Sequence, residues 1–214
     1  MRKDVLVGAL IASTCLASPR HAPAGIVCPD SMYCTVSFTR TYTGSYRPGE
    51  PYDTVTIAPD GSGETFAATG ITIRAILRDC NNVPFVGVPA DEILLFNPAL
   101  CFCLPLAGAD HPTDANGVTE FTGTLRGGGC VDRLTVFVDG VAICNIPVKI
   151  NSTDNVPASP CFTDGADISA LASRLGTRVG DSNYSICFDY TEDGNVSGSD
   201  LSFFAAHLGS GCPP

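Results

Sequence analysis

Residues 134–150 read LTVFVDGVAICNIPVKI, two apolar runs rich in β-branched residues on either side of Asp139-Gly140. Both central residues of a tight two-residue hairpin turn need positive φ, and Asp-Gly is one of the pairs that meets this need. The stretch therefore predicts an antiparallel hairpin between Leu134–Val138 and Val141–Ile150.

The same kind of pattern continues over residues 25–152. Period-two alternation is clear in Thr72–Leu77 and in Thr119–Leu125, which predicts strands with one buried and one exposed face. The 22 Gly, the 16 Pro and the absence of Trp also suit a turn-rich β protein. About seven short strands separated by turns indicate a mainly β fold, an antiparallel β-sandwich. The expected strands are Cys34–Tyr42, Thr54–Ala58, Ile71–Arg78, Ile93–Phe96, Val118–Leu125, Leu134–Val138 and Val141–Ile150.

The beginning of the sequence predicts export. Arg2 and Lys3 precede the apolar run Val5–Ala17, and small residues follow, so we expect a signal peptide over residues 1–24 with cleavage after Ala17 or after Ala24. An apolar run of about 13 residues is too short to cross a hydrocarbon core of ~30 Å, so no membrane span is expected. The net charge of −10 excludes nucleic acid as a partner, because nothing in the chain would neutralise a run of phosphates.

Cysteine usage agrees with a secreted protein. The chain has 11 cysteines, and removal of the signal peptide takes Cys15 with it. The even number that remains predicts disulfides, and if all pair within the chain, at least one bridge must join residues before 152 to residues after it. A metal cluster that uses Cys101 and Cys103 is the alternative, but no Cys-x-x-Cys pair or nearby histidine supports it.

After Ile150 the composition changes to small polar residues and prolines, which predicts a short linker over 153–159 and a second module over 160–214. Within this module, residues 167–177 and 200–210 repeat one apolar pattern at an interval of 33 positions. We expect two short helices that begin at an Asp N-cap, end near a glycine and bury their apolar stripes against each other. The stripe residues are Ile168, Leu171, Ala172 and Leu175 in the first helix, and Leu201, Phe204, Ala205 and Leu208 in the second.

The segment before the second helix, residues 189–200, reads DYTEDGNVSGSD and predicts a 12-residue loop that binds one Ca²⁺ ion. Calcium takes six to eight oxygen ligands, which must recur at alternate positions of a chain that wraps the ion, with a glycine at the sharp turn. Gly194 stands at that turn, and Val196 is expected to point into the core and pair with a matching loop. The predicted ligands are the side chains of Asp189, Thr191, Asp193 and Asp200, the backbone carbonyl of Asn195, and Ser197 directly or through water.

The first repeat lacks these ligands. Val156, Ala158 and Pro160 occupy the equivalent positions 1, 3 and 5, so we expect its calcium site to be lost. Cysteines bracket the module, and a disulfide, which stabilises by about 2–4 kcal/mol, is a reasonable replacement for the missing ion. For the second loop, a surface turn without an ion is the alternative reading.

Two family resemblances extend this interpretation. Residues 154–214 resemble a dockerin, in which two calcium loops are each closed by Asp; Ile71–Gly87 and Thr113–Leu125 resemble bacterial immunoglobulin-like modules of the invasin type. Together they imply an immunoglobulin-like sandwich followed by a small all-α, dockerin-like EF-hand pair. In dockerins of polysaccharide-degrading complexes, a cohesin binds the module near loop positions 10 and 11, which are Gly198 and Ser199 in this chain. The partner that the resemblance implies is therefore a cohesin-like or other extracellular protein.

Catalytic motifs do not stand out. No Gly-x-Ser-x-Gly, His-Glu-x-x-His or phosphate-binding glycine loop occurs, so we expect no enzyme. The first functional hypothesis is a secreted calcium-binding assembly protein, at the bacterial cell surface or in extracellular polysaccharide degradation. The alternative is a structural surface or adhesion protein in which calcium only stabilises the fold, and a small hydrolase is a third, weaker reading.

Overall fold

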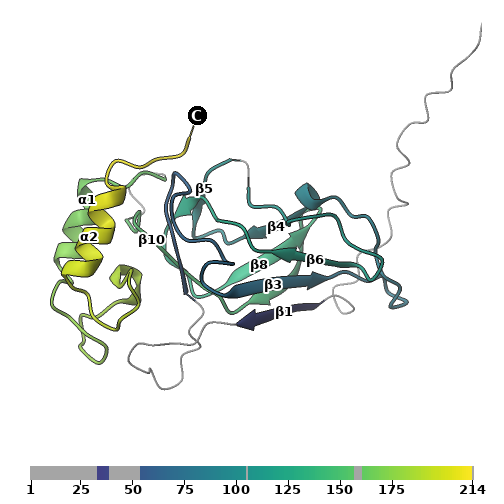
Figure 1. Ribbon diagram of the computed structural model, residues 1–214, viewed down its shortest axis with the longest axis horizontal. Coiled ribbons are helices and arrows are strands. Elements are labelled where there is room, and N and C mark those ends of the chain that lie inside the picture. Colours follow the sequence, from purple (N-terminus) through teal and green to yellow (C-terminus); the bar gives the residue numbers. More distant parts are fainter. Residues whose placement is uncertain (1–32, 39–53, 105, 157–160, 214) are drawn as a thin grey trace, which may run out of the picture.

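A computed structural model describes residues 33–38, 54–104, 106–156 and 161–213, the first of these segments as backbone only. Most of the regular elements are strands (Figure 1). The predicted signal peptide and the end of the strand expected over Cys34–Tyr42 lie outside these residues. The elements are β1 Tyr33–Phe38, β2 Thr54–Ile57, β3 Ile71–Ile76, η2 Ala90–Glu92, β4 Ile93–Phe96, β5 Cys101–Phe102, β6 Val118–Phe121, β7 Gly127–Gly128, β8 Leu134–Val138, β9 Val141–Ile146, β10 Lys149–Ser152, α1 Gly165–Ala172, η3 Ile186–Phe188 and α2 Gly198–His207.

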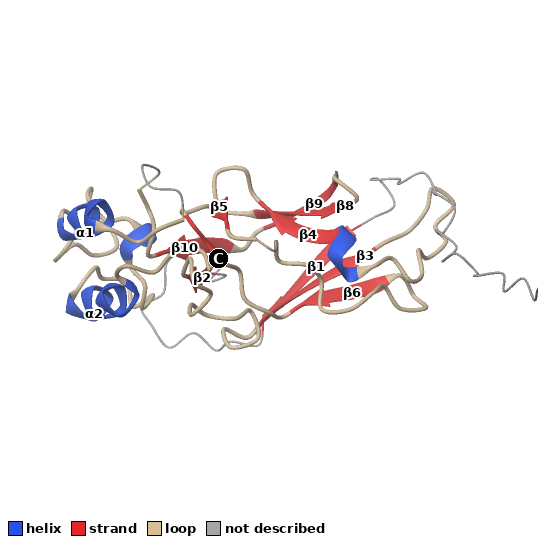
Figure 2. Cartoon of the chain, turned by 90° about the horizontal axis from the view of Figure 1, so that it is seen from above, coloured by secondary structure: helices blue, strands red, loops and turns tan. Residues whose placement is uncertain are grey.

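Two three-stranded antiparallel sheets, with orders β1-β3-β6 and β4-β8-β9, form the body of the molecule. They lie as two layers in Figure 2, and a continuous apolar core fills the space between them. The mainly β fold and the sandwich are thus confirmed. Members of the core from the two layers include Ile71, Ile73, Phe121, Ile93, Leu95, Leu134 and Val136.

Alternation explains how β3 faces this core. Ile71, Ile73 and Ala75 are buried, whereas Arg74 points outward and forms an ion pair with Glu120 on the neighbouring strand β6. The β8–β9 hairpin turns at Asp139-Gly140, with φ of 48° and 76°, as the sequence predicted. Local pattern and turn chemistry therefore specify the same pairing.

One predicted strand is divided in two. The run expected over Val141–Ile150 breaks at Pro147: β9 ends at Ile146, and β10 then pairs in parallel with β2, away from β8. Proline has no N–H to donate to a ladder, and the N–H of Val148 turns back to the carbonyl of Ile146 at 2.8 Å. The small sheets β2–β10 and β5–β7 therefore form the end of the sandwich nearest the helices (Figure 1).

The two helices begin earlier than the apolar pattern predicted. Their N-caps are Asp164 and Ser197, while Asp167 and Asp200 stand three residues later and accept a hydrogen bond from the N-cap N–H, as in a capping box. The prediction that these two later aspartates are the N-caps is wrong, because their carboxylates close the box from inside the helix. Neither of the described helices has the length and apolar character that crossing a membrane would need.

Three disulfides join the C-terminal module to the sandwich. They are Cys101–Cys161, Cys103–Cys212 and Cys130–Cys187, with Cα–Cα distances of 5.6, 5.2 and 5.7 Å. Cys80 and Cys144 are disulfide-bonded as well. The inference that at least one bridge crosses between the halves is confirmed. Cys101 and Cys103, the cysteines of the alternative metal cluster, each form a disulfide with a cysteine of the C-terminal module.

Gly117 offers a test of this fold. Its φ is +73°, and a Cβ at this position would overlap the carbonyl oxygen of Leu77. Gly140 has a similar φ of +76° but open space around it. We expect Gly117→Ala to lower the free energy of unfolding by about 2–5 kcal/mol, because left-handed strain and overpacking add, and Gly140→Ala to lower it by about 1–2 kcal/mol through strain alone. Urea denaturation measures both, and equal losses would contradict the tight packing of the Gly117 turn.

Candidate functional site

The predicted calcium loop, residues 189–200, connects η3 to α2, and its two ends are its most buried acids. Asp189 and Asp200 are both 0% exposed. Thr191, Asp193 and Asn195, which stand between them, are exposed at the rim, and Ser197 is half-buried. The loop thus places two predicted ligand carboxylates inside, together with Glu192, which is 6% exposed, and the other predicted ligands around the edge.

Asp200 ties the two arms of the loop together. Its Oδ1 accepts hydrogen bonds from the N–H and the hydroxyl of Thr191, at 2.9 and 3.1 Å, and its Oδ2 accepts one from the N–H of Ser197 at 2.8 Å. Because Ser197 is also the N-cap of α2, this one carboxylate fixes both the loop and the start of the helix.

Asp189 holds the sharp turn of the loop. It accepts hydrogen bonds from the N–H groups of Asp193 at 3.1 Å and Gly194 at 3.0 Å. Gly194 has φ of 86°, which glycine adopts without strain, as the sequence predicted for position 6. The hydroxyl of Tyr184 also donates to Asp189, at 2.6 Å. Sequence reasoning missed Tyr184, because it lies outside the 12-residue pattern.

The side chains of the other two predicted ligands, Asp193 and Asn195, contact each other. Asp193 Oδ1 accepts hydrogen bonds from the backbone N–H and the side-chain amide of Asn195, at 2.8 and 3.2 Å. Within the part of the chain that the structure describes, only cysteine sulfurs form a group of three potential metal ligands within 4.8 Å of one another, so the carboxylates of Asp189, Asp193 and Asp200 are spread more widely.

The donor set nevertheless has the chemistry of a calcium site. Every predicted ligand offers a carboxylate, hydroxyl or carbonyl oxygen, which are the ligands that calcium prefers. Asp189 and Asp200 would hold the ion from the buried side. Asp193 would have to turn from Asn195 toward it, a change in one exposed side chain.

A two-fold repeat relates the two halves of the module. Val196 exchanges backbone hydrogen bonds with residues 176–177, which follow α1, and Thr163 exchanges the equivalent bonds with residues 209–210, which follow α2. Each of these positions is related to its counterpart by 33 residues. The expectation that Val196 pairs with the matching loop is therefore wrong, since it pairs with the segment after the other helix.

The first repeat holds its buried acid in another way. Asp167 is 1% exposed, and its carboxylate accepts hydrogen bonds from the N–H groups of Asn155 at 2.9 Å, Val156 at 2.8 Å and Asp164 at 2.9 Å. Val156 thus contributes its backbone N–H here. Positions 158 and 160 lie outside the described residues.

Asp154 is a second acid beside this repeat. It is 3% exposed, and the N–H of Phe162 donates to its Oδ2 at 3.2 Å. Burial raises the pKa of Asp154 to about 6, and the nearby carboxylates of Asp167 and Asp164 add to this rise. Sequence reasoning missed this residue, because it precedes the loop pattern.

The predicted calcium loop also contacts the sandwich directly. Thr56 on β2 donates its hydroxyl to the carbonyl of Tyr190 at 3.3 Å. Asn151 on β10 donates its side-chain amide to the carbonyls of Ile186 at 3.0 Å and Asp189 at 3.2 Å. The backbone that enters the loop is therefore held by the edge of the β2–β10 sheet.

A groove lies on the outer side of the loop. Its volume is about 830 Å³, and its lining comes from both repeats. One wall is the loop and the start of α2, and the other is the segment that follows α1. The lining residues include Asp193, Asn195, Ser197, Leu201, Leu175 and Arg178.

Comparison with known proteins gives no family for the chain. No family model matches it, and no curated protein matches it. Among solved structures, it matches a chain of an N-terminal interface mutant of a type II cohesin–X-dockerin complex from Acetivibrio cellulolyticus, with 16% identity over 58% of this chain and 86% of that chain, and a TM-score of 0.25. A chain of the C-terminal interface mutant of such a complex matches with 13% identity over 74% and 96%, and a TM-score of 0.27.

The family assignment made from the sequence is wrong. An EF-hand has a helix on each side of its loop, whereas the loop at 189–200 is entered from the three-residue 3₁₀ turn η3 and followed by α2. The described part of the module has two short helices, so an all-α EF-hand pair of the dockerin type is not formed. The invasin-type assignment of the sandwich likewise has no family match to support it.

The raised pKa of Asp154 predicts a pH dependence of stability. Because the native state holds this proton more tightly than the unfolded chain, the stabilisation is complete below pH 4 and is lost as pH rises through about 6. We expect the free energy of unfolding of the wild type, relative to Asp154→Asn, to fall by up to ~3 kcal/mol between pH 4 and pH 7. Urea denaturation of both proteins without calcium measures this difference, and parallel pH profiles would show that Asp154 titrates normally.

Proposed function

We propose that the chain is a secreted, non-catalytic protein whose C-terminal module binds one Ca²⁺ ion in the loop Asp189–Asp200, and that the ordered module serves protein–protein assembly. The observation that carries the proposal is the complete burial of Asp189 and Asp200 at the two ends of one 12-residue loop.

Burial of charge supports the calcium part. Moving a carboxylate out of water is costly unless a partner offsets the loss of hydration, and two such groups in one loop also repel each other. Backbone N–H groups and hydroxyls donate to both carboxylates and offset part of this cost. A divalent cation between the arms of the loop would offset both costs, and the oxygen-rich rim at Thr191, Asp193 and Ser197 would complete its coordination.

Cysteine chemistry supports secretion. All eight cysteines whose side chains the structure describes are disulfide-bonded. Disulfides of this density persist in oxidising compartments and are rare in the cytosol. They agree with the export signal expected at the start of the sequence.

The groove beside the loop supports assembly through a protein partner. Asp193, Asn195 and Ser197 line it and are also predicted ligands, so an ion that fixes them would fix one wall of the groove. Leu175 and Val179 near it are 39% and 40% exposed, and apolar side chains at a polar groove are typical of protein contact sites. Calcium would then control whether this surface is ready to bind.

Substitution at position 12 tests the ion. We expect the wild type to bind one Ca²⁺ and Asp200→Asn to bind it about tenfold more weakly or not at all, because one negative ligand is lost. Isothermal titration calorimetry measures affinity and stoichiometry. Asp167→Asn is the matched control, since Asp167 is equally buried at the equivalent position of the first repeat and should leave the stoichiometry at one. No titratable calcium in the wild type would end the proposal.

Assembly and pure stabilisation are separated by a second experiment. The purified wild type, immobilised and exposed to extracellular proteins of the producing cell, should retain a partner in calcium and release it in a chelator. Asp200→Asn should retain none. A calcium-dependent rise in melting temperature without any calcium-dependent partner would instead support the structural alternative.

A further inference from the structure

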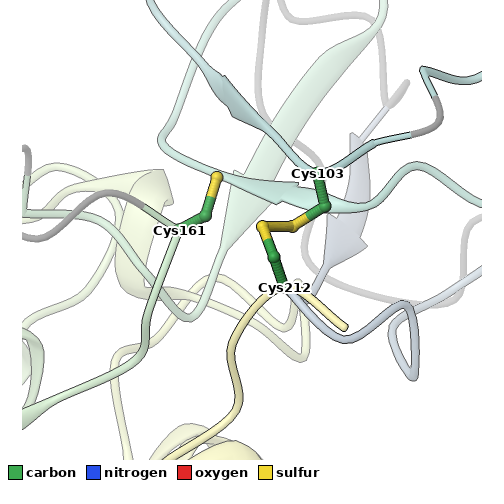
Figure 3. A group of neighbouring side chains, drawn as sticks. All are labelled: Cys103, Cys161 and Cys212. Atoms are coloured by element: carbon green, nitrogen blue, oxygen red, sulfur yellow. A yellow bond between two sulfur atoms is a disulfide. The ribbon is translucent and has the colours of Figure 1, made fainter. Parts of the chain in front are cut away.

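Two of the disulfides that cross between sandwich and module lie against each other. The sulfurs of Cys103, Cys161 and Cys212 are all within 4.8 Å of one another. Figure 3 shows Cys161 beside the Cys103–Cys212 disulfide, and Cys161 is itself bonded to Cys101. The four cysteines come from β5 and the residue just beyond it, from the segment before α1, and from the segment after α2. Two bridges therefore meet in one place.

Solvent reaches these sulfurs unequally. Cys212 is exposed and Cys101 is half-buried, whereas Cys103 and Cys161 are 2% and 5% exposed. Thiol–disulfide exchange requires a thiolate to approach one sulfur of the bond. An external thiol can therefore attack Cys212, while the buried pair reacts only with sulfurs already inside.

We propose that these four cysteines form a thiol–disulfide exchange site that captures an external thiol on Cys212 and moves the bridge at Cys161 from Cys101–Cys161 to Cys103–Cys161. This inference is independent of calcium binding. The co-reactant is a low-molecular-weight thiol or an exposed protein cysteine.

The exchange has two steps. The external thiolate bonds to Cys212 Sγ, the Cys103–Cys212 bond breaks, and its electron pair leaves on Cys103 as a thiolate. That thiolate attacks Cys161 Sγ, the Cys101–Cys161 bond breaks, and Cys101 leaves as a thiolate that takes up a proton. One thiol and two disulfides enter, and one thiol and two disulfides result, so no oxidant or reductant is consumed.

The groups around Cys161 favour attack by Cys103 with Cys101 as the leaving group. Cys161 is the buried sulfur within reach of Cys103, which makes Cys101 the leaving group. Cys101 Sγ lies 3.4 Å from Oδ2 of Asp154, the acid whose pKa is raised to about 6. Asp154 in its protonated form can donate to the leaving sulfur, and as a neutral group it does not repel the departing thiolate. It acts as a general acid for the exchange.

The product keeps the module attached. Cys103–Cys161 and Cys130–Cys187 would still join it to the sandwich while Cys212 carries the captured thiol. The site would thus give the exported chain a covalent attachment point without loosening its two parts.

Glutathione provides the test. The oxidised full-length protein is incubated with millimolar glutathione, quenched with N-ethylmaleimide, and digested without reduction for mass spectrometry. We expect glutathione on Cys212, the maleimide on Cys101, and a new Cys103–Cys161 bridge. Maleimide on Cys103 with Cys101–Cys161 intact, glutathione on another cysteine, or no change in the bridges would each overturn the proposal.

Two variants locate the steps. Cys101→Ser with Cys161→Ser removes the acceptor bridge, so capture on Cys212 should persist and the maleimide should move entirely to Cys103. Asp154→Asn should slow the appearance of the Cys101 adduct without slowing glutathionylation of Cys212, and Asp154→Glu should restore it. Equal slowing of both adducts by Asp154→Asn would point to a general structural effect and remove Asp154 from the exchange.

Discussion

The C-terminal module is organised around two carboxylates that have no contact with solvent. Asp200 joins Thr191 to the first turn of α2, and Asp189 holds the turn at Gly194, so together they determine the path of every residue between them. Buried anions are tolerated only where donors or cations surround them. Loop geometry, helix start and the arrangement of polar groups at the rim all follow from meeting this one electrostatic requirement.

The module depends on the sandwich because its own core is small. Among the residues whose side chains the structure describes, five buried residues form its apolar cluster, against eighteen in the sandwich. A core of this size cannot offset the entropy of ordering the chain, and small exported domains commonly rely on disulfides or metals for this reason. Three bridges and the hydrogen bonds from Thr56 and Asn151 supply that support at one end of the sheet.

Strands, turns and helices that depend on neighbouring residues could be predicted from the sequence, whereas features that depend on contacts between distant residues could not. The strands of the sandwich and the Asp139-Gly140 turn followed from alternation and turn preference, and Gly194 stands at the predicted turn. Both helices were expected, but their apolar stripes are shorter than the pattern predicted. Leu171 and Phe204 are buried, whereas Leu175 and Leu208 lie beyond the helix ends and are exposed. The family assignment failed because a 12-residue ligand pattern does not encode the segment that enters the loop. That segment is fixed by Cys187 through its bond to Cys130, a contact between distant residues.

Buried acids lie at both repeats of the module, Asp154 and Asp167 at the first and Asp189, Glu192 and Asp200 in the second, and the two groups meet the cost of repulsion differently. At the first repeat, Asp167 accepts backbone N–H groups. Burial, with the nearby Asp167 carboxylate, raises the pKa of Asp154 to about 6, so a proton can neutralise one member of the pair. In the second, Asp189 and Asp200 accept hydrogen bonds from the loop itself, and the hydroxyls and carboxylate at the rim add oxygens that only a cation would use fully. A proton can neutralise a pair of carboxylates that has no further oxygen ligands beside it, whereas Ca²⁺ can neutralise a pair that has such ligands. The divergence of two related repeats toward a protonated acid and a proposed metal site thus follows from which residues stand between the paired carboxylates.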